Sequence, residues 1–418
     1  MIKIAVIGCG SRGHCYADLL LAQKDKFEAA ALCDINPEQI TKIKKLIDMG
    51  DIPVFLEPDD FFEEKRADLL IISTPDRFHV PQAVKALELG YDIVLEKPIS
   101  DNREELDMLV ETQEKTGGKV IICHELRYAP AFSKCKELLE SGVVGKLSVI
   151  DASERVSYWH WTQAYVRGPG AYLEIGHPAL LAKCSHDLDL LHWYANSKCE
   201  SVSSVGDLHF FKEENAPEGA TDRCLDCPHM ETCPYSAKEI YINRWHRDGE
   251  PEFVWPFNKV SIEVPLTEEN IRKGLREGEF GRCAFKCNPE KVDRQLVQMS
   301  FENGVKASLK MVYASEAGRR ISFYGTHGEI IMDERTDVIS VLAYGKEPQY
   351  INISEINVGG WAHGGGDSIF MDSIYGILTG TEKPITSLDE SVEAHLMGIA
   401  ADESRILDGE LAYVHKKN

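Results

Sequence analysis

The sequence predicts an α/β protein in which a doubly wound parallel sheet comes first and a second domain follows. Three observations predict this. An apolar run at residues 2–7 leads into a glycine-rich turn and an apolar stripe at helical spacing. Strand-like and helix-like segments then alternate as far as residue 124, which is typical of a parallel sheet with helices on both faces. The length of 418 residues leaves room for a second domain, which we expect at residues 125–418.

Each expected element follows from its own pattern. In the first domain, residues 1–124, short apolar runs predict strands at 2–7, 29–33, 68–73, 92–95 and 120–123. Helical spacing predicts helices at 37–49, 81–90 and 103–116. In the second domain we expect strands at 147–153, 295–301, 305–311 and 319–324, and helices at 178–194 and 390–407. Parallel strands place their carboxyl ends at one edge of the sheet, where such folds bind ligands.

The glycine-rich turn has the spacing of a dinucleotide-binding site. Gly8, Gly10 and Gly13 follow the pattern Gly-x-Gly-x-x-Gly, and Asp34 ends the second strand 21 residues after Gly13. The glycines allow a tight turn and a close approach to a pyrophosphate, whose charge rests on the following helix N-terminus. An acidic side chain at the end of the second strand accepts hydrogen bonds from ribose hydroxyls and repels a 2′-phosphate, so we expect NAD rather than NADP. The alternative is a tight turn that opens an ordinary βα unit.

The amino-acid composition argues against some classes of binding partner. With 46 basic and 68 acidic residues the formal net charge is −22, which argues against nucleic acid and against an anionic membrane surface. No apolar run approaches the length of a membrane span, and the N-terminus begins in a strand without the regions of a signal peptide. We therefore expect a cytoplasmic protein with a small-molecule ligand. Its twelve cysteines are then thiols or metal ligands rather than a disulfide framework.

Polar motifs follow the strands at the expected ligand edge. Thr74-Pro75-x-x-x-His79 follows one strand, Glu96-Lys97-Pro98 follows the next, and His124-x-x-Arg127-Tyr128-x-Pro130 comes after the last. Together with the glycine-rich turn, this ordered set resembles the Gfo/Idh/MocA family, which contains glucose–fructose oxidoreductase and inositol dehydrogenase. The resemblance implies a Rossmann domain followed by an α+β domain with a large, open, mostly antiparallel sheet.

The resemblance also implies a function. Members of the family use nicotinamide cofactors on sugars, cyclitols and similar polyols, so we expect NAD, a small carbohydrate or polyol substrate, and a homodimer or homotetramer. Lys97 would lie beside the nicotinamide, and a lysine amine can take a hydroxyl proton where burial and a neighbouring cation disfavour its charged form. The expected cofactor contacts are Gly8, Gly10, Ser11, Arg12, Gly13, Asp34, Thr74, Pro75, His79, Glu96 and Lys97.

His186 is the second expected catalytic residue. The apolar residues of the helix at 178–194 form one stripe, and His186 falls on a different face, from which it can line a cleft beside Lys97. The family places a proton-transferring histidine in a comparable His-Asp-x-Asp stretch. Many members carry an aspartate four residues earlier, where this chain has Ala182 followed by Lys183. The added cation suggests a charged substrate group such as a uronate, or a different proton relay; a solvated lysine is the alternative.

Other side chains of the second domain are expected to contact the substrate. Aromatic residues around Trp159 and His160 can stack on a sugar face, although aromatic residues more often fill a core. Arg167 can bind a carboxylate or several hydroxyls. Trp361 and the glycine-rich segment that begins at His363 are typical of a binding loop, or alternatively of a helix entry. The expected substrate contacts are Arg127, Tyr128, Trp159, His160, Arg167, Lys183 and His363.

Five cysteines fall in a segment that the core fold does not require. Cys224-x-x-Cys227 is followed by Cys233, with Cys283 and Cys287 further along. The segment, about residues 210–292, is rich in charge, proline and glycine and lacks long apolar periods, so it is expected to be an insertion that a metal clip would order. Four of the five thiolates would suit a closed, structural zinc site. An iron–sulfur cluster and unliganded thiols are the alternatives.

Three functions fit these motifs. The first is an NAD-dependent dehydrogenase for a secondary alcohol of a sugar, a cyclitol or a sugar derivative, in which Lys97 and His186 handle the proton. The second is a glycosidase that uses the same first step: transient oxidation acidifies a neighbouring C–H bond, a glycosidic leaving group is eliminated, and the hydride is returned. The third is a non-catalytic NAD-binding sensor in which the cysteine-rich segment is an interaction module.

Overall fold

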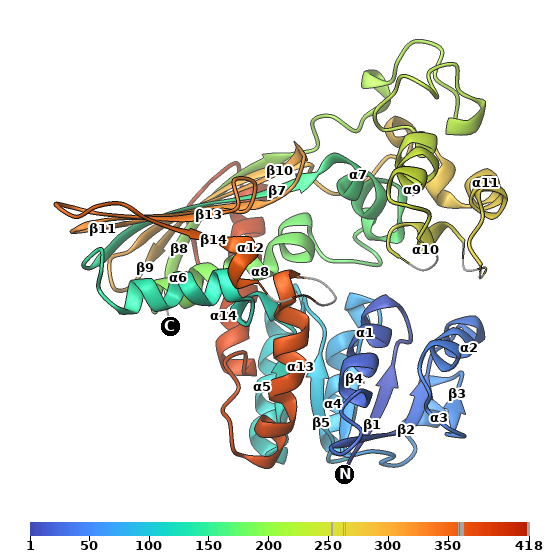
Figure 1. The fold of residues 1–418 in the computed structure, drawn as a ribbon, viewed down its shortest axis with the longest axis horizontal. Coiled ribbons are helices and arrows are strands. Elements are labelled where there is room, and N and C mark those ends of the chain that lie inside the picture. Colours follow the sequence, from blue (N-terminus) through green and yellow to red (C-terminus); the bar gives the residue numbers. More distant parts are fainter. Residues whose placement is uncertain (252–253, 262, 264, 358, 360–362, 416–418) are drawn as a thin grey trace.

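The computed structural model describes residues 1–415 apart from 252–253, 262, 264, 358 and 360–362. It contains one sheet of six strands and one of nine (Figure 1). Figure 1 shows the nine-stranded sheet above the six-stranded sheet, with the segment that carries α9, α10 and α11 projecting at the upper right. Within the described ranges, no helix has the length and apolar character needed to span a bilayer. Trp361, expected in a binding loop, lies outside the described residues.

The first sheet is parallel, with the strand order β3-β2-β1-β4-β5-β6. Its strands are β1 (Ile2–Ile7), β2 (Phe27–Cys33), β3 (Val54–Phe55), β4 (Leu69–Ile72), β5 (Asp92–Leu95) and β6 (Val120–Ile122). Its helices are α1 (Ser11–Leu21), α2 (Pro37–Leu46), α3 (Pro58–Phe61), α4 (His79–Glu88) and α5 (Arg103–Thr116). The strand order reverses between β1 and β4, so their carboxyl ends flank the crevice where such sheets bind ligands. The predicted Rossmann architecture is confirmed; the two-residue strand β3 was missed because it lacks an apolar run.

The second sheet is mixed and mostly antiparallel, as expected. Its order is β14-β13-β12-β11-β7-β10-β9-β8-β15, and β7 pairs with β10 in parallel. Its strands are β7 (Leu147–Ser157), β8 (Cys199–Asp207), β9 (Arg294–Phe301), β10 (Lys306–Ser315), β11 (Arg319–Gly325), β12 (Gly328–Asp333), β13 (Val338–Ala343), β14 (Gln349–Asn352) and β15 (Ala412–Tyr413). Alternate residues such as Ile150, Val297 and Leu309 are buried, which leaves the opposite face of the sheet toward solvent.

Helices cover the buried face of this sheet. The helices of the second half are α6 (Pro130–Glu140), α7 (Tyr158–Trp161), α8 (Ala179–Ala195), α9 (Arg244–Arg247), α10 (Phe257–Val260), α11 (Glu268–Glu277), α12 (Ile353–Ile356), α13 (Gly366–Thr379) and α14 (Leu388–Ile406). Residues of α6, α8 and α14 share one hydrophobic core with the inward side chains of the strands. Pro178, expected to be the first residue of this helix, is the N-cap residue that precedes α8. Helix α8 is buried on nearly all sides, so its polar residues must find partners inside the protein.

The last two long helices also complete the core around the first sheet. Helix α13 packs beside α1, and Phe370, Met371 and Ile374 are fully buried in the core on that face. Leu388 and Ile399 of α14 join the core on the other face. The spatial unit around the first sheet therefore includes residues far beyond 124.

The cysteine-rich segment is an excursion between two neighbouring strands. It leaves the second sheet after Asp207 and returns at Arg294, and these two residues face each other on β8 and β9. Ile240, Trp245 and Ile271 belong to a buried apolar core of its own. The segment thus buries more apolar surface than its sequence pattern indicated. Several short helices contribute its buried residues, so no single long period marks the sequence.

Candidate active site

The turn between β1 and α1 has the geometry of a dinucleotide cradle. Gly8 has φ +89°, a value that favours glycine, and a Cβ on Gly13 would come 2.1 Å from the carbonyl oxygen of Gly8. A Cβ on Gly10 would meet nothing within 4 Å, so this backbone faces open space. Helix α1 begins at Ser11, and within the described residues no side chain caps its N-terminus. Its free N–H groups suit a pyrophosphate, and these residues therefore fit a dinucleotide.

Asp34 lies at the same edge, directly after β2. Its Oδ2 accepts a hydrogen bond from the backbone N–H of Cys9 at 2.7 Å, and its Oδ1 accepts one from that of Asn36 at 2.8 Å. The carboxylate is thereby held against the glycine-rich turn. Its remaining lone pairs can accept hydrogen bonds from ribose hydroxyls.

Arg12 joins the cofactor turn to three carboxylates from other segments. Its guanidinium lies 2.7 Å from Glu96, 2.6 Å from Glu125 and 2.7 Å from Asp367. The hydroxyl of Tyr16 lies within hydrogen-bond distance of both Glu96, at 2.6 Å, and Glu125, and its one proton can be donated to either carboxylate. Burial raises the pKa of Glu125. Burial acts in the same direction on Glu96, but the charges of Arg12 and Lys97, together with hydrogen bonds from Tyr16 and Arg12, outweigh it and lower the pKa of that carboxyl. Glu96 therefore anchors its loop as an ion-pair partner.

Two buried histidines fix the loops that follow β4 and β5. The ring nitrogens of His79 lie 2.7 Å from the carbonyl oxygen of Pro98 and 2.8 Å from that of Thr74, so the ring fastens one loop to the other. His395 of α14 accepts a hydrogen bond at Nε2 from the backbone N–H of Ile99 at 2.8 Å. The two imidazoles therefore hold the same peptide unit, Pro98–Ile99, directly after the predicted catalytic lysine. This places His79 in a positioning role behind the expected cofactor contacts.

Lys97 extends from the first sheet toward the second half of the chain. It precedes a cis peptide bond to Pro98, and its Nζ lies 3.4 Å from the carbonyl oxygen of Ala182 in α8. The hydroxyl of Tyr165 lies 3.4 Å from the same carbonyl oxygen. The Tyr165 ring stacks on His160, with 6.3 Å between the ring centroids. The amine therefore stands between the cofactor edge of the first sheet and an aromatic wall of the second domain.

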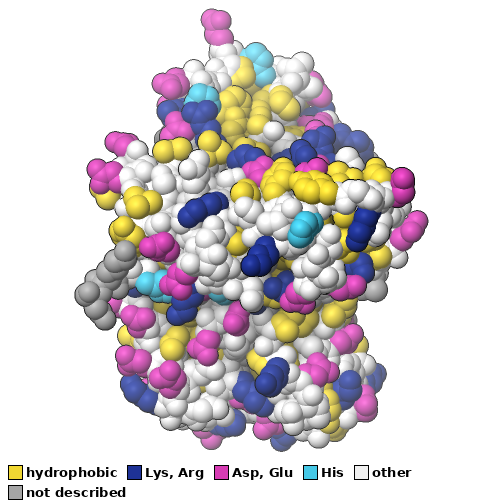
Figure 2. All heavy atoms as spheres, turned by 90° about the vertical axis from the view of Figure 1, so that its left-hand side faces the viewer, with side chains coloured by type: hydrophobic (Ala, Val, Ile, Leu, Met, Phe, Trp, Pro, Cys, Tyr) yellow, Lys and Arg dark blue, Asp and Glu magenta, His cyan; other side chains and the backbone are white. Residues whose placement is uncertain are grey.

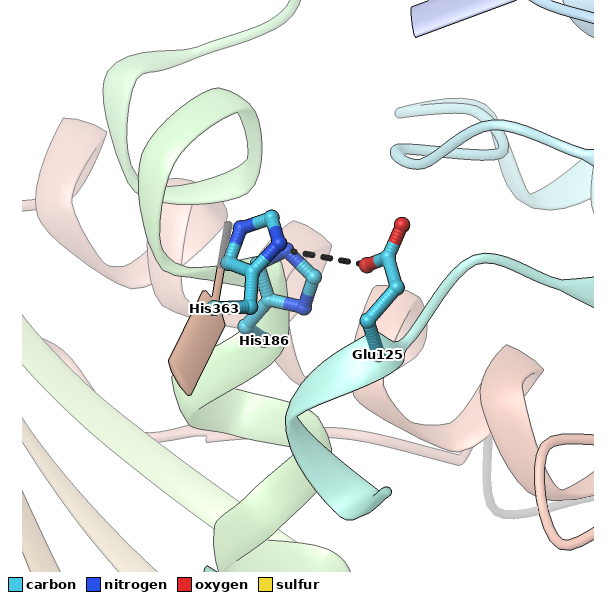
Figure 3. A group of neighbouring side chains, drawn as sticks. All are labelled: Glu125, His186 and His363. Carbon is cyan, nitrogen blue, oxygen red and sulfur yellow. Dashed lines mark ion pairs between the residues drawn. The ribbon is translucent and has the colours of Figure 1, made fainter. Parts of the chain in front are cut away.

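Glu125, His186 and His363 lie close together, as Figure 3 shows. His186 Nε2 lies 3.7 Å from Glu125 Oε2, and the two imidazole centroids are 5.2 Å apart. Figure 3 shows both rings on the same side of the carboxylate. Burial lowers the pKa of His186 well below its usual value, and the charge of Lys97 lowers it further, so this imidazole is neutral at neutral pH. A neutral imidazole can accept a proton at one nitrogen and donate at the other.

The charged residues of α8 next to His186 pair inside the protein. Asp187 lies 2.8 Å from Arg319, whose guanidinium also lies 3.1 Å from Glu154, and Glu154 lies 3.0 Å from Lys183. Burial raises the pKa of Asp187 to about 6. Lys183 is thus neutralised by a buried glutamate of β7. Its predicted contact with a charged substrate group finds no support in this position.

Arg127 is part of the core and not of the substrate pocket. Its side chain is 1% exposed, and it donates two hydrogen bonds of 2.8 Å to Asp189 and one of 2.8 Å to the carbonyl oxygen of Ile385. His124 Nδ1 lies 3.0 Å from the same Asp189 carboxylate. Burial would raise the pKa of Asp189, but Arg127 and His124 outweigh it and hold that pKa well below its usual range. The structure therefore corrects the predicted substrate contact of Arg127, and Tyr128 likewise packs in the core.

The remaining predicted substrate residues divide into two groups. His160 and His363 lie with the groups around Lys97 and His186, as described above. Arg167 is fully buried beneath the cysteine-rich segment, where it donates to the carbonyl oxygens of Arg282 at 2.7 Å and Tyr235 at 2.6 Å. The guanidinium of Arg244 stacks over the Trp159 ring, 3.7 Å from the ring centroid. Arg167 is therefore a structural residue, and Trp159 supports the wall behind His160.

Sequence reasoning missed four residues of this site. Glu125 directly follows a motif histidine and could have been found from that neighbour. Tyr165 lies shortly after the aromatic residues around Trp159 and His160 and could have been found from that neighbourhood. Arg319 and His395 gave no signal, because each acts through a partner that is more than a hundred residues away in the sequence.

His395 gives the site a predicted pH dependence. Its Nδ1 lies 2.8 Å from the carbonyl oxygen of Ser391, so the ring is neutral, with Nε2 free to accept. Burial, followed by the charge of His124, lowers the pKa of His395 from 6.5 to about 3. Below pH 6.5 the unfolded chain therefore binds a proton that the folded chain does not. We expect this residue to reduce the free energy of unfolding by about 1.4 kcal/mol for each pH unit below 6.5.

Urea unfolding from about pH 7 to about pH 5 measures this effect. His160 and His186 act in the same direction, whereas the raised pKa values of Glu125 and Asp187 act in the opposite one. The contribution of His395 is therefore isolated by the variant His395→Gln, which cannot titrate. The variant is expected to be less stable at neutral pH and to lose less stability on acidification. Identical pH slopes for the two proteins would contradict the assignment.

The fold and the site together define an oxidoreductase that binds a dinucleotide. Residues 2–124 match the family model described as "Oxidoreductase family, NAD-binding Rossmann fold", and residues 136–406 match the model described as "Oxidoreductase family, C-terminal alpha/beta domain". The chain belongs to this family, the Gfo/Idh/MocA oxidoreductases.

Several curated proteins are similar to this chain. YteT of Bacillus subtilis is 23% identical over 394 residues, which covers 88% of this chain and 88% of YteT. Inositol 2-dehydrogenase of Corynebacterium glutamicum is 24% identical over 203 residues, and myo-inositol 2-dehydrogenase of Thermotoga maritima is 22% identical over 224 residues. These two matches cover 48% and 54% of this chain, and 56% and 64% of the dehydrogenases.

Solved structures share the fold over the whole chain. Scyllo-inositol dehydrogenase from Lactobacillus casei, solved with NAD(H) and scyllo-inositol, has a TM-score of 0.67 at 14% identity, covering 99% of each chain. The WlbA dehydrogenase from Bordetella pertussis, solved with NADH and UDP-GlcNAcA, has a TM-score of 0.67 at 17% identity, covering 100% of this chain and 99% of that one. At this level of identity the likeness establishes the fold and not the substrate.

Proposed function

We propose that the protein is an NAD-dependent dehydrogenase that oxidises a secondary alcohol of a sugar, a cyclitol or a sugar derivative. The observation that carries this proposal is the position of Lys97. It leaves the ligand edge of the first sheet and reaches α8 beside Tyr165, near the neutral His186. Relatives named as inositol dehydrogenases support the substrate class.

The residues of the chain divide the work of this reaction. Bound NAD supplies the chemistry of accepting a hydride from the alcohol carbon. The amine of Lys97 takes the hydroxyl proton of the same alcohol as the carbonyl group forms. His186 accepts and returns protons at a ring nitrogen, and its Nε2 lies beside the carboxyl of Glu125. The aromatic wall at His160 and Tyr165 packs against the ring of the substrate and limits access of water.

A substrate screen tests this function. The protein is incubated with NAD and a panel of inositols, sugars, uronates and aryl glycosides, while NADH formation and aglycone release are followed in parallel. NADH formation with one of these classes is the expected result. Aglycone release without net NADH would contradict the dehydrogenase proposal and favour the elimination mechanism. Binding of NAD without activity in either assay would favour a sensor.

Asp34 is proposed to set the preference for NAD. In the variant Asp34→Asn the hydrogen-bonding shape is kept but the charge is lost. We expect the KM for NAD to rise about tenfold or more, because hydrogen bonds to a charged group are worth about 1.5–3 kcal/mol, and the KM for NADP to fall because the 2′-phosphate is no longer repelled. Steady-state kinetics with both cofactors measure this. Asp51→Asn on an exposed loop is the control, and an unchanged NADP preference in Asp34→Asn would contradict the assignment.

The open face of the second sheet is proposed to join copies of the chain into a dimer or tetramer. Val149 pairs with Tyr324, and Val205 pairs with Leu296, across adjacent strands, and each of these side chains is at least 39% exposed. Figure 2 shows hydrophobic side chains gathered in a band across the upper part of the molecule. Exposed apolar patches of this kind are typical of interfaces. Light scattering of the purified protein tests this, and a monomeric mass would contradict it.

A further inference from the structure

The cysteine-rich segment brings four of its thiols around one cavity. Cys224, Cys227, Cys233 and Cys283, here named the cavity cysteines, all line it, and the rest of its wall is largely apolar. Cys287, the fifth thiol of the segment, is not part of this lining, and its Sγ lies 3.2 Å from the carbonyl oxygen of Cys283. The structure therefore selects four ligands from the five that the sequence offered.

Backbone pairing brings these distant thiols together. Arg223 and Arg282 form an antiparallel bridge, which brings the two segments that carry Cys224 and Cys283 next to each other. The N–H of Cys283 also donates to the carbonyl oxygen of Asp222 at 2.8 Å. All twelve cysteines are free thiols, so no disulfide among them accounts for this convergence. Thiols brought together in this way form a binding site for a soft or borderline metal centre.

A buried cation adjoins the same cavity. The Arg167 side chain is 0% exposed, and its Nη2 lies 3.3 Å from the sulfur of Cys224. Its Nη1 has no hydrogen-bond partner among the described residues. A buried charge requires compensation, which neutral thiols cannot supply. Thiolates bound to a metal carry negative charge, so Arg167 is the partner that such a centre needs.

The spacing of the sulfurs distinguishes between two kinds of metal centre. In a tetrahedral zinc site each sulfur is about 2.3 Å from the metal, which puts neighbouring sulfurs about 3.8 Å apart. In the described part of the chain, no three sulfurs of the cavity cysteines lie within 4.8 Å of one another. A cubane iron–sulfur cluster binds each thiolate at a separate iron and so holds the thiolates further apart. Cys227 and Cys233 also precede prolines, as does the last cysteine of bacterial ferredoxin motifs.

We propose that the cavity cysteines ligate a [4Fe–4S] cluster whose negative charge is compensated by Arg167. This replaces the zinc site that the sequence spacing favoured. The cluster clamps the cysteine-rich segment onto the second domain, because Arg167 ends the helical turn Thr162–Arg167. That turn also contains Tyr165, which stands opposite Lys97. The cluster is thus a structural support behind the wall of the active site, and it does not depend on the identity of the substrate.

Metal analysis of protein purified without oxygen and without chelator tests the proposal. We expect about four iron atoms and about four acid-labile sulfides per chain, with broad visible absorption that dithionite bleaches. Cys227→Ala is expected to lose most of the iron, because Cys227 is a ligand. The matched variant Cys287→Ala is expected to retain it, because that thiol is outside the cavity. Retention of NAD binding in both variants shows that the first domain is intact.

Several results would overturn this assignment. A content of one zinc per chain without acid-labile sulfide would show that the cavity cysteines bind zinc and not a cluster. Protein without iron after anaerobic purification, or after reconstitution with iron and sulfide, would remove the metal centre altogether. Equal iron in Cys227→Ala and in the unmodified protein would place the iron elsewhere. The analysis of the unmodified protein stands even if a variant fails to fold, and it is independent of whether any polyol is oxidised.

Discussion

Replacing Lys97 by methionine is expected to abolish hydride transfer while leaving cofactor binding intact. Methionine keeps most of the length of the side chain and removes the amine that takes the hydroxyl proton. Loss of a general base lowers turnover by about a hundredfold to ten-thousandfold. The glycine-rich turn and Asp34 are separate from Lys97, whose amine contacts the carbonyl oxygen of Ala182. Turnover is measured with the best substrate of the screen, and NAD affinity is measured by titration of the same variant.

The matched control is Lys115→Met on helix α5, whose lysine is 72% exposed. It removes the same charge from the same domain, and its turnover is expected to equal that of the unmodified protein. A Lys97→Met enzyme that keeps more than about a tenth of its turnover would rule out Lys97 as the general base. Loss of NAD binding together with turnover would instead show that Lys97 holds the cofactor.

Replacing Asp189 by alanine is expected to cause the largest loss of stability among the ionic residues of the site. Asp189 accepts two hydrogen bonds of 2.8 Å from Arg127 and lies 3.0 Å from His124, and all three side chains are at most 1% exposed. Removing the carboxylate leaves a guanidinium buried without its main partner. Breaking a buried pair in this way costs about 3–5 kcal/mol. Urea unfolding at neutral pH measures the change.

An exposed ion pair provides the comparison. Glu111 and Lys115 are 3.1 Å apart on α5, and both side chains are more than 60% exposed. Glu111→Ala is expected to change the free energy of unfolding by less than about 0.5 kcal/mol, because solvent screens such pairs. If Asp189→Ala cost as little as Glu111→Ala, the Arg127 pair would not be a stabilising element of the core.

The sequence predicted those parts of the fold and site that are encoded locally. The Gly8 turn, the acid at Asp34 and the apolar runs of the first sheet each carry their signal within a few residues, and the structure has them where they were expected. The helix around His186 was likewise predicted from its spacing. These features depend on backbone conformation and periodicity, which short segments determine by themselves.

Partners that are distant in the sequence could not be predicted. The sequence shows that Arg127 and Arg167 are cations. It does not show that Arg127 pairs with Asp189, or that Arg167 donates to backbone carbonyl oxygens, inside the protein. Arg12 was an expected cofactor contact, and its ion pair with Asp367 spans 355 positions of sequence. A charged residue that is suited to binding a ligand is equally suited to an internal pair, and only the folded arrangement separates the two.

The late position of α13 and α14 in the chain has a consequence for biosynthesis. During translation the strands of the first sheet leave the ribosome long before Phe370, Met371 and Leu388, which cover its two faces. The nascent sheet therefore carries uncovered apolar surface for most of the time that elongation takes, and such intermediates are prone to aggregate. Asp367, which pairs with Arg12 of the cofactor turn, is also made late. Chaperones would thus have a long interval in which to act on this protein, and premature termination near the 3′ end of its message would yield chains that retain a dinucleotide motif but lack the helices that close its core.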